Sequence, residues 1–537
     1  RERSEMSLNQ LSALEIVARV RAGEIRASEV LEASLAQIRR LDGQPGSLDE
    51  KPLEPAEDQK IHAFIHQTED LARQQAEEVD RKVAAGEDPG MLAGVPVAIK
   101  DIFTLKGIET TAASRILSNF KPPYTATPVQ KLMDAGALIL GKTNLDEFAF
   151  GSSSESSAFK PAPNNPWDTS RVPGGSSGGS TASVAAEEVA LSLGTDTGGS
   201  IRQPAAFCGV VGLKPTYGRV SRYGLMAFSS SLDCPGPIAR NVSDTALTLQ
   251  AMAGLDPHDS TSSTMPVSDY LEALKKGVKG LRIGLSPDYA HLFYPDFETG
   301  ELGMESIQSE ISQAVEHAAN VLADLGAEIV ENVPLPNTRY SIPTYFVISR
   351  VEAASNLHRF DGVKYGYRTP DEVADLQELL RRTRAEGFGS QPKLRILMGM
   401  YLSAAGFAEN YYQRALKVRA MIRKDFERAF DPQGEFRLDA ILTPTTATTA
   451  FKRDDFFGNS VRMQYSDQMT VSANHAGLPA MTIPGGLDGN NLPIGIQFIG
   501  ADFREDLILR AGFAFEQATR DEAWRSVRPA ALRQEVE

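Results

Sequence analysis

Two glycine- and serine-rich clusters lie between Pro173 and Pro204, in the stretch PGGSSGGSTASVAAEEVALSLGTDTGGSIRQP. A flexible linker of similar composition has nothing that can pack, but the segment from Ala182 to Leu193 carries Ala, Val and Leu side chains that can be buried. Glycine lets the backbone approach a ligand closely, because it has no Cβ atom. The pattern therefore indicates an active site built on two turns.

Ser200 is placed where a strand is expected to end and a short helix to begin. The backbone N–H groups of Thr197, Gly198, Gly199 and Ser200 would then be free to converge on one oxygen atom. Such an oxyanion hole is typical of acyl transfer, with Ser200 as the nucleophile. The alternative is that Ser200 is an N-cap, which is the more common role for a serine before a helix.

A nucleophilic serine needs a base. None of the seven histidines lies near the clusters, so a Ser-His-Asp triad has no local support. Residues 174–178 match G-x-S-x-G, but no strand precedes them, and neither cluster ends in the Gly-Lys-Ser/Thr of a phosphate-binding loop. The remaining base is a lysine. Lys100 ends the strand-like segment 92–101, although taken alone it would be an exposed lysine at a strand end.

The elements that must position these residues alternate between strands and helices. Two helices are predicted within 8–41, and further helices over 68–85, 127–135, 180–188, 304–325 and 507–518, with helical periodicity throughout 345–430. Strands are predicted over 92–101, 137–140, 189–194, 281–285, 327–333, 440–442, 480–483 and 494–499. This alternation predicts one large α/β domain whose sheet is covered by helices on both faces. The polar, proline-bearing loop 42–60 is expected to be disordered or to contact a partner.

The composition is that of an ordinary globular protein, with 42% hydrophobic and 23% charged residues. A net charge of −15 argues against nucleic-acid binding by this chain alone, because phosphate binding needs clustered Lys and Arg. Cys208 and Cys234 predict two reduced thiols, and metal-ligand spacing is absent. No apolar run approaches the ~20 residues that span a membrane, and the first ten residues are polar. We therefore expect a cytoplasmic protein.

Three motifs, in order, resemble the amidase signature family: GVPVAIKD with Lys100, PGGSSGGS with Ser176, and DTGGSIRQPA with Ser200. The resemblance covers nearly the whole chain and implies a single amidase-signature domain, 1–537, with a central mixed sheet and a catalytic core at about 90–240. It implies a Ser–cis-Ser–Lys triad in which Ser200 attacks a carboxamide carbon and Ser176 relays the proton to Lys100. A free lysine has a pKa near 10.4 and is charged at pH 7, so burial is expected to lower the pKa of Lys100 to about 8.

More specific blocks resemble the A, or glutaminase, subunits of bacterial glutamyl-tRNA(Gln)/aspartyl-tRNA(Asn) amidotransferases. They are 214–233, 355–366, 384–389 and 411–419. The resemblance implies hydrolysis of glutamine to supply ammonia for ATP-dependent amidation of a mischarged tRNA. It implies B and C subunits as partners in a heterotrimer, with the tRNA held mainly by the partner. This chain is then expected to bind no cofactor, no metal and no membrane, with ATP and Mg in the partner subunit.

Free glutamine is a zwitterion, so its pocket needs a cation for the carboxylate and an anion for the ammonium group. Under the same resemblance, Arg395 in KLRILMG matches the arginine for the α-carboxylate, and Asp467 in YSDQMTVSAN matches the aspartate for the α-ammonium. Tyr345 is a further candidate for the pocket wall. Taken alone, Arg395 would be an ion-pair residue on a helix face and Asp467 an N-cap.

Some segments depart from the family pattern: the longer loop 42–60, Cys234-Pro235, residues 456–464 and His475. Two alternatives therefore stay open. The divergence just before Asp467 favours a stand-alone amidase that hydrolyses another small-molecule amide. A catalytically silent scaffold that only binds partners is the other alternative, and the intact Lys100, Ser176 and Ser200 count against it.

Overall fold

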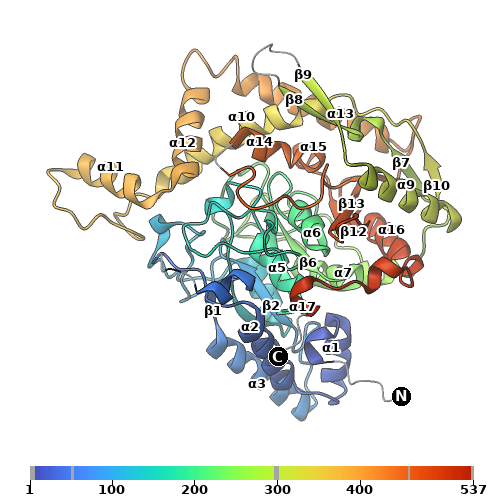
Figure 1. Ribbon diagram of the computed structural model, residues 1–537, viewed down its shortest axis with the longest axis horizontal. Helices are drawn as coiled ribbons and strands as arrows, with labels where there is room; N and C mark the ends of the chain where they lie inside the picture. Colours follow the sequence, from blue (N-terminus) through green and yellow to red (C-terminus); the bar gives the residue numbers. More distant parts are fainter. Residues whose placement is uncertain (1–6, 50–51, 53, 296–301, 458–459, 534–537) are drawn as a thin grey trace.

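Eleven strands form one mixed sheet in the order β1-β3-β2-β4-β6-β5-β12-β13-β11-β7-β10, which runs through the middle of the molecule (Figure 1). The computed structural model describes residues 7–49, 52, 54–295, 302–457 and 460–533. The strands are β1 Phe64–Gln67, β2 Pro96–Lys100, β3 Leu138–Thr143, β4 Leu191–Asp196, β5 Val211–Lys214, β6 Cys234–Ala239, β7 Arg282–Leu285, β10 Glu328–Val330, β11 Ala440–Pro444, β12 Ala480–Leu487 and β13 Pro493–Gly500. Parallel pairs (β2 with β3 and β4, β7 with β10 and β11) coexist with antiparallel ones, so the α/β fold predicted from the sequence is confirmed.

Helices flank this sheet. In Figure 1, α1–α3 gather at the lower end, α10 and α12–α15 at the upper end, and α9 and α16 at the right. Their bounds are α1 Ala13–Arg21, α2 Ala27–Leu41, α3 Glu69–Ala85, α4 Thr127–Asp134, α5 Gly178–Ala185, α6 Arg202–Cys208, α7 Val242–Met252, α8 Tyr270–Leu274, α9 Ser309–Asp324, α10 Ser341–Asn356, α11 Leu376–Gly387, α12 Ser390–Ser403, α13 Tyr412–Phe430, α14 Ser460–Tyr465, α15 Gln468–Ala476, α16 Glu505–Ala518 and α17 Ala530–Arg533.

Local signals in the sequence account for the ends of the first helices. Ser12 and Glu15 form a reciprocal capping box, in which each side chain accepts a hydrogen bond from the backbone N–H of the other. Helix α3 ends at Gly86, whose φ of +68° is readily adopted only by glycine. These predicted helices are therefore confirmed to within a residue or two at most boundaries.

The sheet brings the two predicted catalytic segments to the same edge. Strand β2 is buried along its whole length and pairs in parallel with β4, with Val97 opposite Leu191 and Ile99 opposite Leu193. The carboxyl ends of parallel strands meet at one edge, where α/β proteins place their sites. Lys100 at the end of β2 therefore lies beside the turn that follows Asp196 at the end of β4.

Several segments differ from the sequence-based expectations, among them β1, β5 and α7, which were not predicted. The helix predicted over 304–325 begins only at Ser309, because Leu302–Ser306 forms strand β9 and pairs with β8, His291–Pro295, in a separate hairpin. Strand β6 was not predicted, since Pro235 and Pro237 break the pattern of a central strand. The expectations for the chain start, loop 42–60 and segment 456–464 fall partly on residues 1–6, 50–51, 53 and 458–459. These positions lie outside the described residues.

Hydrogen bonds to the rest of the protein hold described positions of the polar loop 42–60 in place. Asp42 is fully buried. Its carboxylate accepts a hydrogen bond from the backbone N–H of Ala63, and its backbone carbonyl oxygen accepts one from the N–H of His62. Ser47 pairs with Lys160 as an isolated bridge. Within the described residues no helix is long and apolar enough to cross a membrane.

Candidate active site

Lys100 lies in a ring of three hydroxyl groups. Its Nζ atom is 2.8 Å from Ser176 Oγ, 2.8 Å from Ser177 Oγ and 3.0 Å from Thr195 Oγ1, and the side chain is fully buried. The peptide bond between Gly175 and Ser176 is cis, and α5 begins directly after Ser177. The structure thus brings together Lys100 and Ser176, as the sequence motifs predict. Ser177 and Thr195 were not singled out from the sequence, where nothing distinguishes them from other small hydroxyl residues.

Burial lowers the pKa of Lys100 to about 7, although the charges of Asp146, Asp196 and Asp233 act in the opposite direction. None of these carboxylates contacts the lysine, because each is held by other groups. A neutral amine has two N–H donors and one lone pair, which three hydroxyl neighbours can satisfy. About half of the lysine would then be neutral at pH 7, which is what a general base requires.

The second glycine cluster forms the turn from Thr197 to Ser200. Within the described residues, the backbone N–H groups of Thr197, Gly198, Gly199 and Ser200 donate to no other group, so all four are free to hold an oxyanion. The Ser200 hydroxyl, which also makes no hydrogen bond within those residues, is 5% exposed. The two clusters meet where the N–H of Ser177 donates to the Ser200 carbonyl oxygen at 3.2 Å. Ser200 is not the N-cap of α6, because Ile201 occupies that position.

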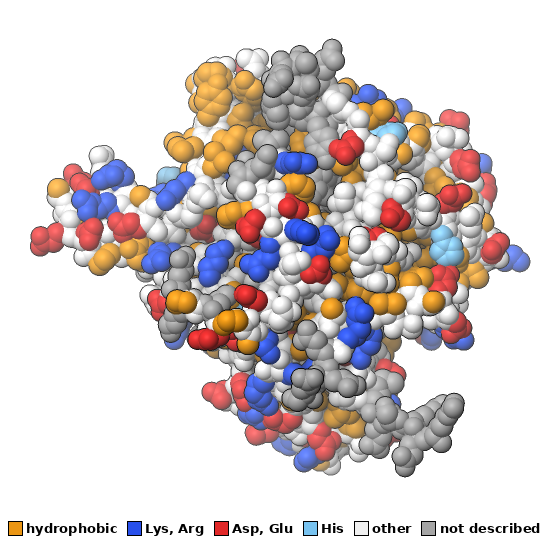
Figure 2. All heavy atoms as spheres, viewed as in Figure 1, with side chains coloured by type: hydrophobic (Ala, Val, Ile, Leu, Met, Phe, Trp, Pro, Cys, Tyr) orange, Lys and Arg blue, Asp and Glu red, His pale blue; other side chains and the backbone are white. Residues whose placement is uncertain are grey.

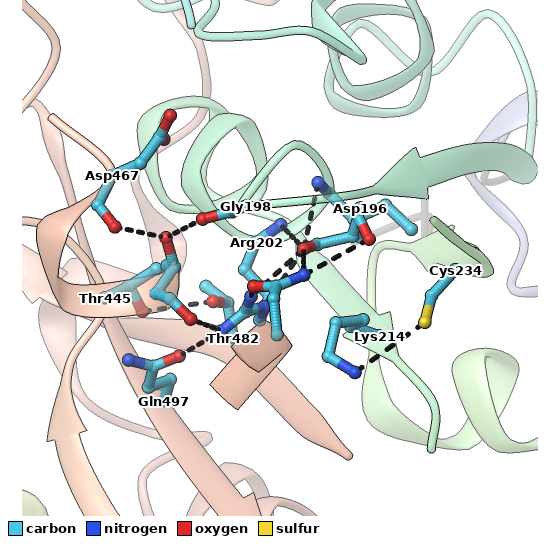
Figure 3. A network of polar contacts seen from close by, with 12 residues as sticks. Asp196, Gly198, Arg202, Lys214, Cys234, Thr445, Asp467, Thr482 and Gln497 are labelled. Carbon is cyan, nitrogen blue, oxygen red and sulfur yellow. Dashed lines mark hydrogen bonds and ion pairs between the residues drawn. The ribbon is translucent and has the colours of Figure 1, made fainter. Parts of the chain in front are cut away.

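A buried polar network supports this turn (Figure 3). The Asp196 carboxylate accepts two hydrogen bonds of 3.0 Å from the Arg202 guanidinium and a third of 2.8 Å from Asn474. Arg202 also donates to the Thr470 carbonyl oxygen, and Thr470 Oγ1 donates to the Gly198 carbonyl oxygen at 2.7 Å. The guanidinium charge lowers the pKa of Asp196 to about 2 despite the opposing effect of burial. The network therefore holds the turn in place through its carbonyl oxygen and its flanking residues, while leaving its N–H groups free.

Only glycine fits at the centre of the turn. Gly199 has a φ of +147°, and a Cβ atom there would lie 2.2 Å from Thr470 Oγ1 and 3.1 Å from Asp467 Oδ1. A Cβ atom on Gly198 would lie 3.0 Å from Tyr345 Cζ. Tyr345 and Asp467 are therefore immediate neighbours of the oxyanion-hole segment, although both lie far from it in the sequence.

Asp467 stands at the N-cap position of α15, but its side chain caps nothing. Instead Oδ2 accepts a 2.5 Å hydrogen bond from Ser152 Oγ, and the buried Oδ1 has no partner within the described residues. Burial raises the pKa of Asp467 well above its ordinary value. A buried carboxylate oxygen without a partner beside Gly199 is suited to a cationic group of a ligand.

Arg395 on α12 is 5% exposed and has no carboxylate partner within the described residues. Its Nη1 donates to Gln391 at 2.7 Å, its Cζ lies 5.1 Å from the centre of the Phe150 ring, and its Nε has no partner. A cavity of about 20 Å³ adjoins it, lined in part by Phe150 and Gln391. Burial lowers the pKa of Arg395. The arrangement does not match that of an ion-pair residue on a helix face.

The two cysteines are free and buried, as predicted from the sequence. Burial raises the pKa of both thiols, so neither is suited to act as a nucleophile. Cys234 Sγ lies 3.9 Å from Lys214 Nζ at one side of the network (Figure 3). The described residues contain no group of three or more His, Cys, Asp or Glu side chains placed to hold a metal ion.

Comparison with known proteins gives consistent results. Residues 54–509 match the family described as Amidase. A relative from Carboxydothermus hydrogenoformans, named as the A subunit of glutamyl-tRNA(Gln) amidotransferase, is 51% identical over 96% of this chain and 98% of its own length. The crystal structure of the protein of the same name from Thermotoga maritima superposes with a TM-score of 0.72 at 36% identity, covering 96% of each chain. The structure of a 6-aminohexanoate cyclic dimer hydrolase gives a TM-score of 0.78 at 27% identity, over 98% of this chain and 100% of that one. The chain belongs to the Amidase family.

Proposed function

We propose that this chain is the glutaminase subunit of a glutamyl-tRNA(Gln) amidotransferase. The observation that carries the proposal is a pair of buried groups without partners, the Asp467 carboxyl and the Arg395 guanidinium. Asp467 Oδ1 and Arg395 Nε are both buried and unpartnered, and they do not pair with each other in the part of the chain described. A carboxyl and a guanidinium group held apart in this way match the ammonium and carboxylate groups of a free amino acid, because a bound ammonium group favours the ionised form of Asp467. The names of the relatives support the same conclusion.

In the proposed reaction, Ser200 Oγ attacks the carboxamide carbon of glutamine. Ser176 takes the proton from Ser200 and passes its own proton to neutral Lys100. The carbonyl oxygen becomes an oxyanion held by the N–H groups of residues 197–200. Proton return to the amide nitrogen releases ammonia and leaves a glutamyl ester on Ser200. A water molecule, activated by the same relay, then hydrolyses the ester and releases glutamate.

The relatives are named as subunits, and this chain is accordingly one component of a larger assembly in our proposal. Its partners are the B and C subunits of a heterotrimer, with the mischarged tRNA held mainly by a partner and ATP and Mg bound there. The product is Gln-tRNA(Gln), with Asn-tRNA(Asn) as a second candidate product of the same chemistry. Because the reaction serves translation, we place it in the cytoplasm.

One exposed surface is suited to contact with a partner. Apolar side chains gather over α12 and the segment leading to α13, at the upper left of Figure 2. They include Leu397, Met400, Tyr401 and Phe407, of which Leu397 is 66% exposed. The rings of Tyr401 and Phe407 are 4.5 Å apart. A cluster of exposed aromatic and aliphatic side chains is typical of a protein–protein contact.

The test is ammonia release from glutamine by the purified chain, alone and with its partner subunits, ATP and mischarged tRNA. We expect glutamine hydrolysis that the partners stimulate, and its loss in the Ser200→Ala variant. A stand-alone amidase for another small-molecule amide is the second candidate, favoured by the structural similarity to the 6-aminohexanoate cyclic dimer hydrolase. Good turnover of other amides, with no glutamine hydrolysis and no stimulation by partners, would support that candidate and refute the first.

A further inference from the structure

Arg350 on α10 is a buried cation that the catalytic scheme above does not use. Its side chain is among the largest fully buried ones in the described part of the protein. Nη1 donates to Ser349 Oγ at 3.0 Å, Cζ lies 3.8 Å from the centre of the Phe346 ring, and Nε has no partner. No carboxylate among the described residues forms an ion pair with it. A buried guanidinium without a counter-charge is strongly unfavourable.

The other fully buried arginines of the described structure each have an acidic partner. Arg202 pairs with Asp196, with 3.0 Å between Nε and Oδ2. Arg219 faces Glu505, with 3.5 Å between Nε and Oε2. Arg350 lacks such a partner, which indicates that its counter-charge does not come from the described residues.

Arg350 and Arg395 lie on helices that pack directly against each other. A Cβ atom on Gly399 of α12 would lie 2.0 Å from the Arg350 carbonyl oxygen, so α10 and α12 touch at this point. Arg395 is one turn before Gly399 on the same side of α12. Burial, together with the nearby charge of Arg395, lowers the pKa of Arg350 well below its ordinary value. Two neighbouring guanidinium groups without carboxylate partners form a site for an anion.

The geometry points to Arg350 as a second guanidinium group for the α-carboxylate of glutamine, acting beside Arg395. This inference rests on the proposed function. A carboxylate has two oxygens and about four acceptor positions, so it can accept hydrogen bonds from two guanidinium groups. Tyr345, which contacts the turn at Gly198, is on the same helix as Arg350. Helix α10 would then contribute both to the wall of the acyl-transfer site and to carboxylate recognition.

The test compares Arg350→Met with Arg384→Met in the complex with its partner subunits. Arg384 is a matched control, because it also stacks on a phenylalanine ring, Phe388 at 4.9 Å, but donates to the carbonyl oxygens of Leu357 and Phe360. We expect Arg350→Met to raise the KM for glutamine at least tenfold with a smaller change in kcat, and Arg350→Lys to recover part of the loss. Arg384→Met should leave KM within about twofold of the wild type.

A second measurement separates recognition from a purely structural role. In a Ser200→Ala background, melting temperatures are recorded with and without L-glutamine. Removing an uncompensated buried charge should raise the melting temperature of the ligand-free protein and diminish the stabilisation by L-glutamine. An unchanged KM, or a lower ligand-free melting temperature with the glutamine effect intact, would overturn the assignment of Arg350. Failure of the wild-type complex to hydrolyse glutamine would instead refute the proposed function, and with it glutamine as the occupant.

Discussion

Lys100 Nζ and Ser177 Oγ lie 2.8 Å apart, the same distance that separates Lys100 from the relay residue Ser176. Ser177 Oγ also donates to the Thr195 carbonyl oxygen and accepts from the Thr195 N–H. Its proton is therefore committed to the backbone, so Ser177 receives its hydrogen bond from the lysine. This fixes one N–H of Lys100 on Ser177 and leaves its second N–H and its lone pair for Ser176 and Thr195.

Replacing Ser177 by Ala should slow glutamine hydrolysis without abolishing it. Loss of one buried hydrogen bond to the base costs about 1–1.5 kcal/mol, or roughly a tenfold fall in kcat. Ser176→Ala removes the relay itself and should lower kcat far more. Ser180→Ala is the control, because Ser180 is on the same helix but bonds to Thr143 and the Leu193 carbonyl oxygen. Equal rates for Ser177→Ala and wild type would contradict this role.

The pH dependence of the reaction should follow the ionisation of Lys100. Burial lowers the pKa of this lysine to about 7. The protonated form predominates below that pH and cannot accept a proton, so kcat at saturating glutamine should rise about tenfold per pH unit below 7 and level off above it. The measurement is ammonia release from pH 5 to 9. Glu147→Gln controls for a second group, because burial also raises the pKa of Glu147 to about 7. If the rise in rate with pH is absent in Glu147→Gln, the ionisation belongs to Glu147 instead.

The sequence indicated where Lys100 and Ser200 lie in the fold, because each is in a short motif at the end of a predicted strand. Lys100 follows an apolar segment and Ser200 a Gly-Gly turn, so local patterns placed both residues, and the family resemblance supplied their roles. Contacts made across the fold could not be predicted in the same way. Ser152 meets Asp467 although 315 residues separate them, and Arg350 was not distinguished from any other helical arginine.

Strand β6 and the β8–β9 hairpin show that local sequence patterns also fail to predict parts of the fold. β6 lies inside the sheet between β4 and β5, but Pro235 and Pro237 remove the local strand signal. The hairpin involves residues 302–306, where a helical pattern was expected. In both cases the partner strands, rather than local propensity, decide the conformation.

Asp467→Asn should weaken glutamine binding rather than the chemical step. The amide keeps the shape of the carboxylate but removes the charge that would face the substrate ammonium group, so KM should rise about 10–100-fold, corresponding to ~1.4–2.8 kcal/mol. Burial raises the pKa of Asp467, so its ionised form increases with pH and the wild-type KM should fall as pH rises. The variant should lose this dependence. Ser152→Ala, which removes the hydrogen bond to Oδ2, should have a smaller effect on KM. A variant KM equal to that of the wild type at every pH would refute the assignment.

Asp196→Asn should destabilise the protein by about 3–5 kcal/mol, because it leaves the buried Arg202 charge without its counter-ion. The free energy of unfolding, measured by denaturant titration, gives this loss directly. Asp168→Asn is the control, since the partly exposed Asp168–Arg171 pair should contribute less than about 1 kcal/mol. The pKa of Asp196 is lowered to about 2, so its stabilising effect is complete above the unfolded-state value of about 3.9 and is lost as the pH falls through 2. The stability difference between wild type and variant should therefore shrink between pH 4 and pH 2. A difference that stays constant over that range would show that lost packing, rather than lost charge, explains the effect.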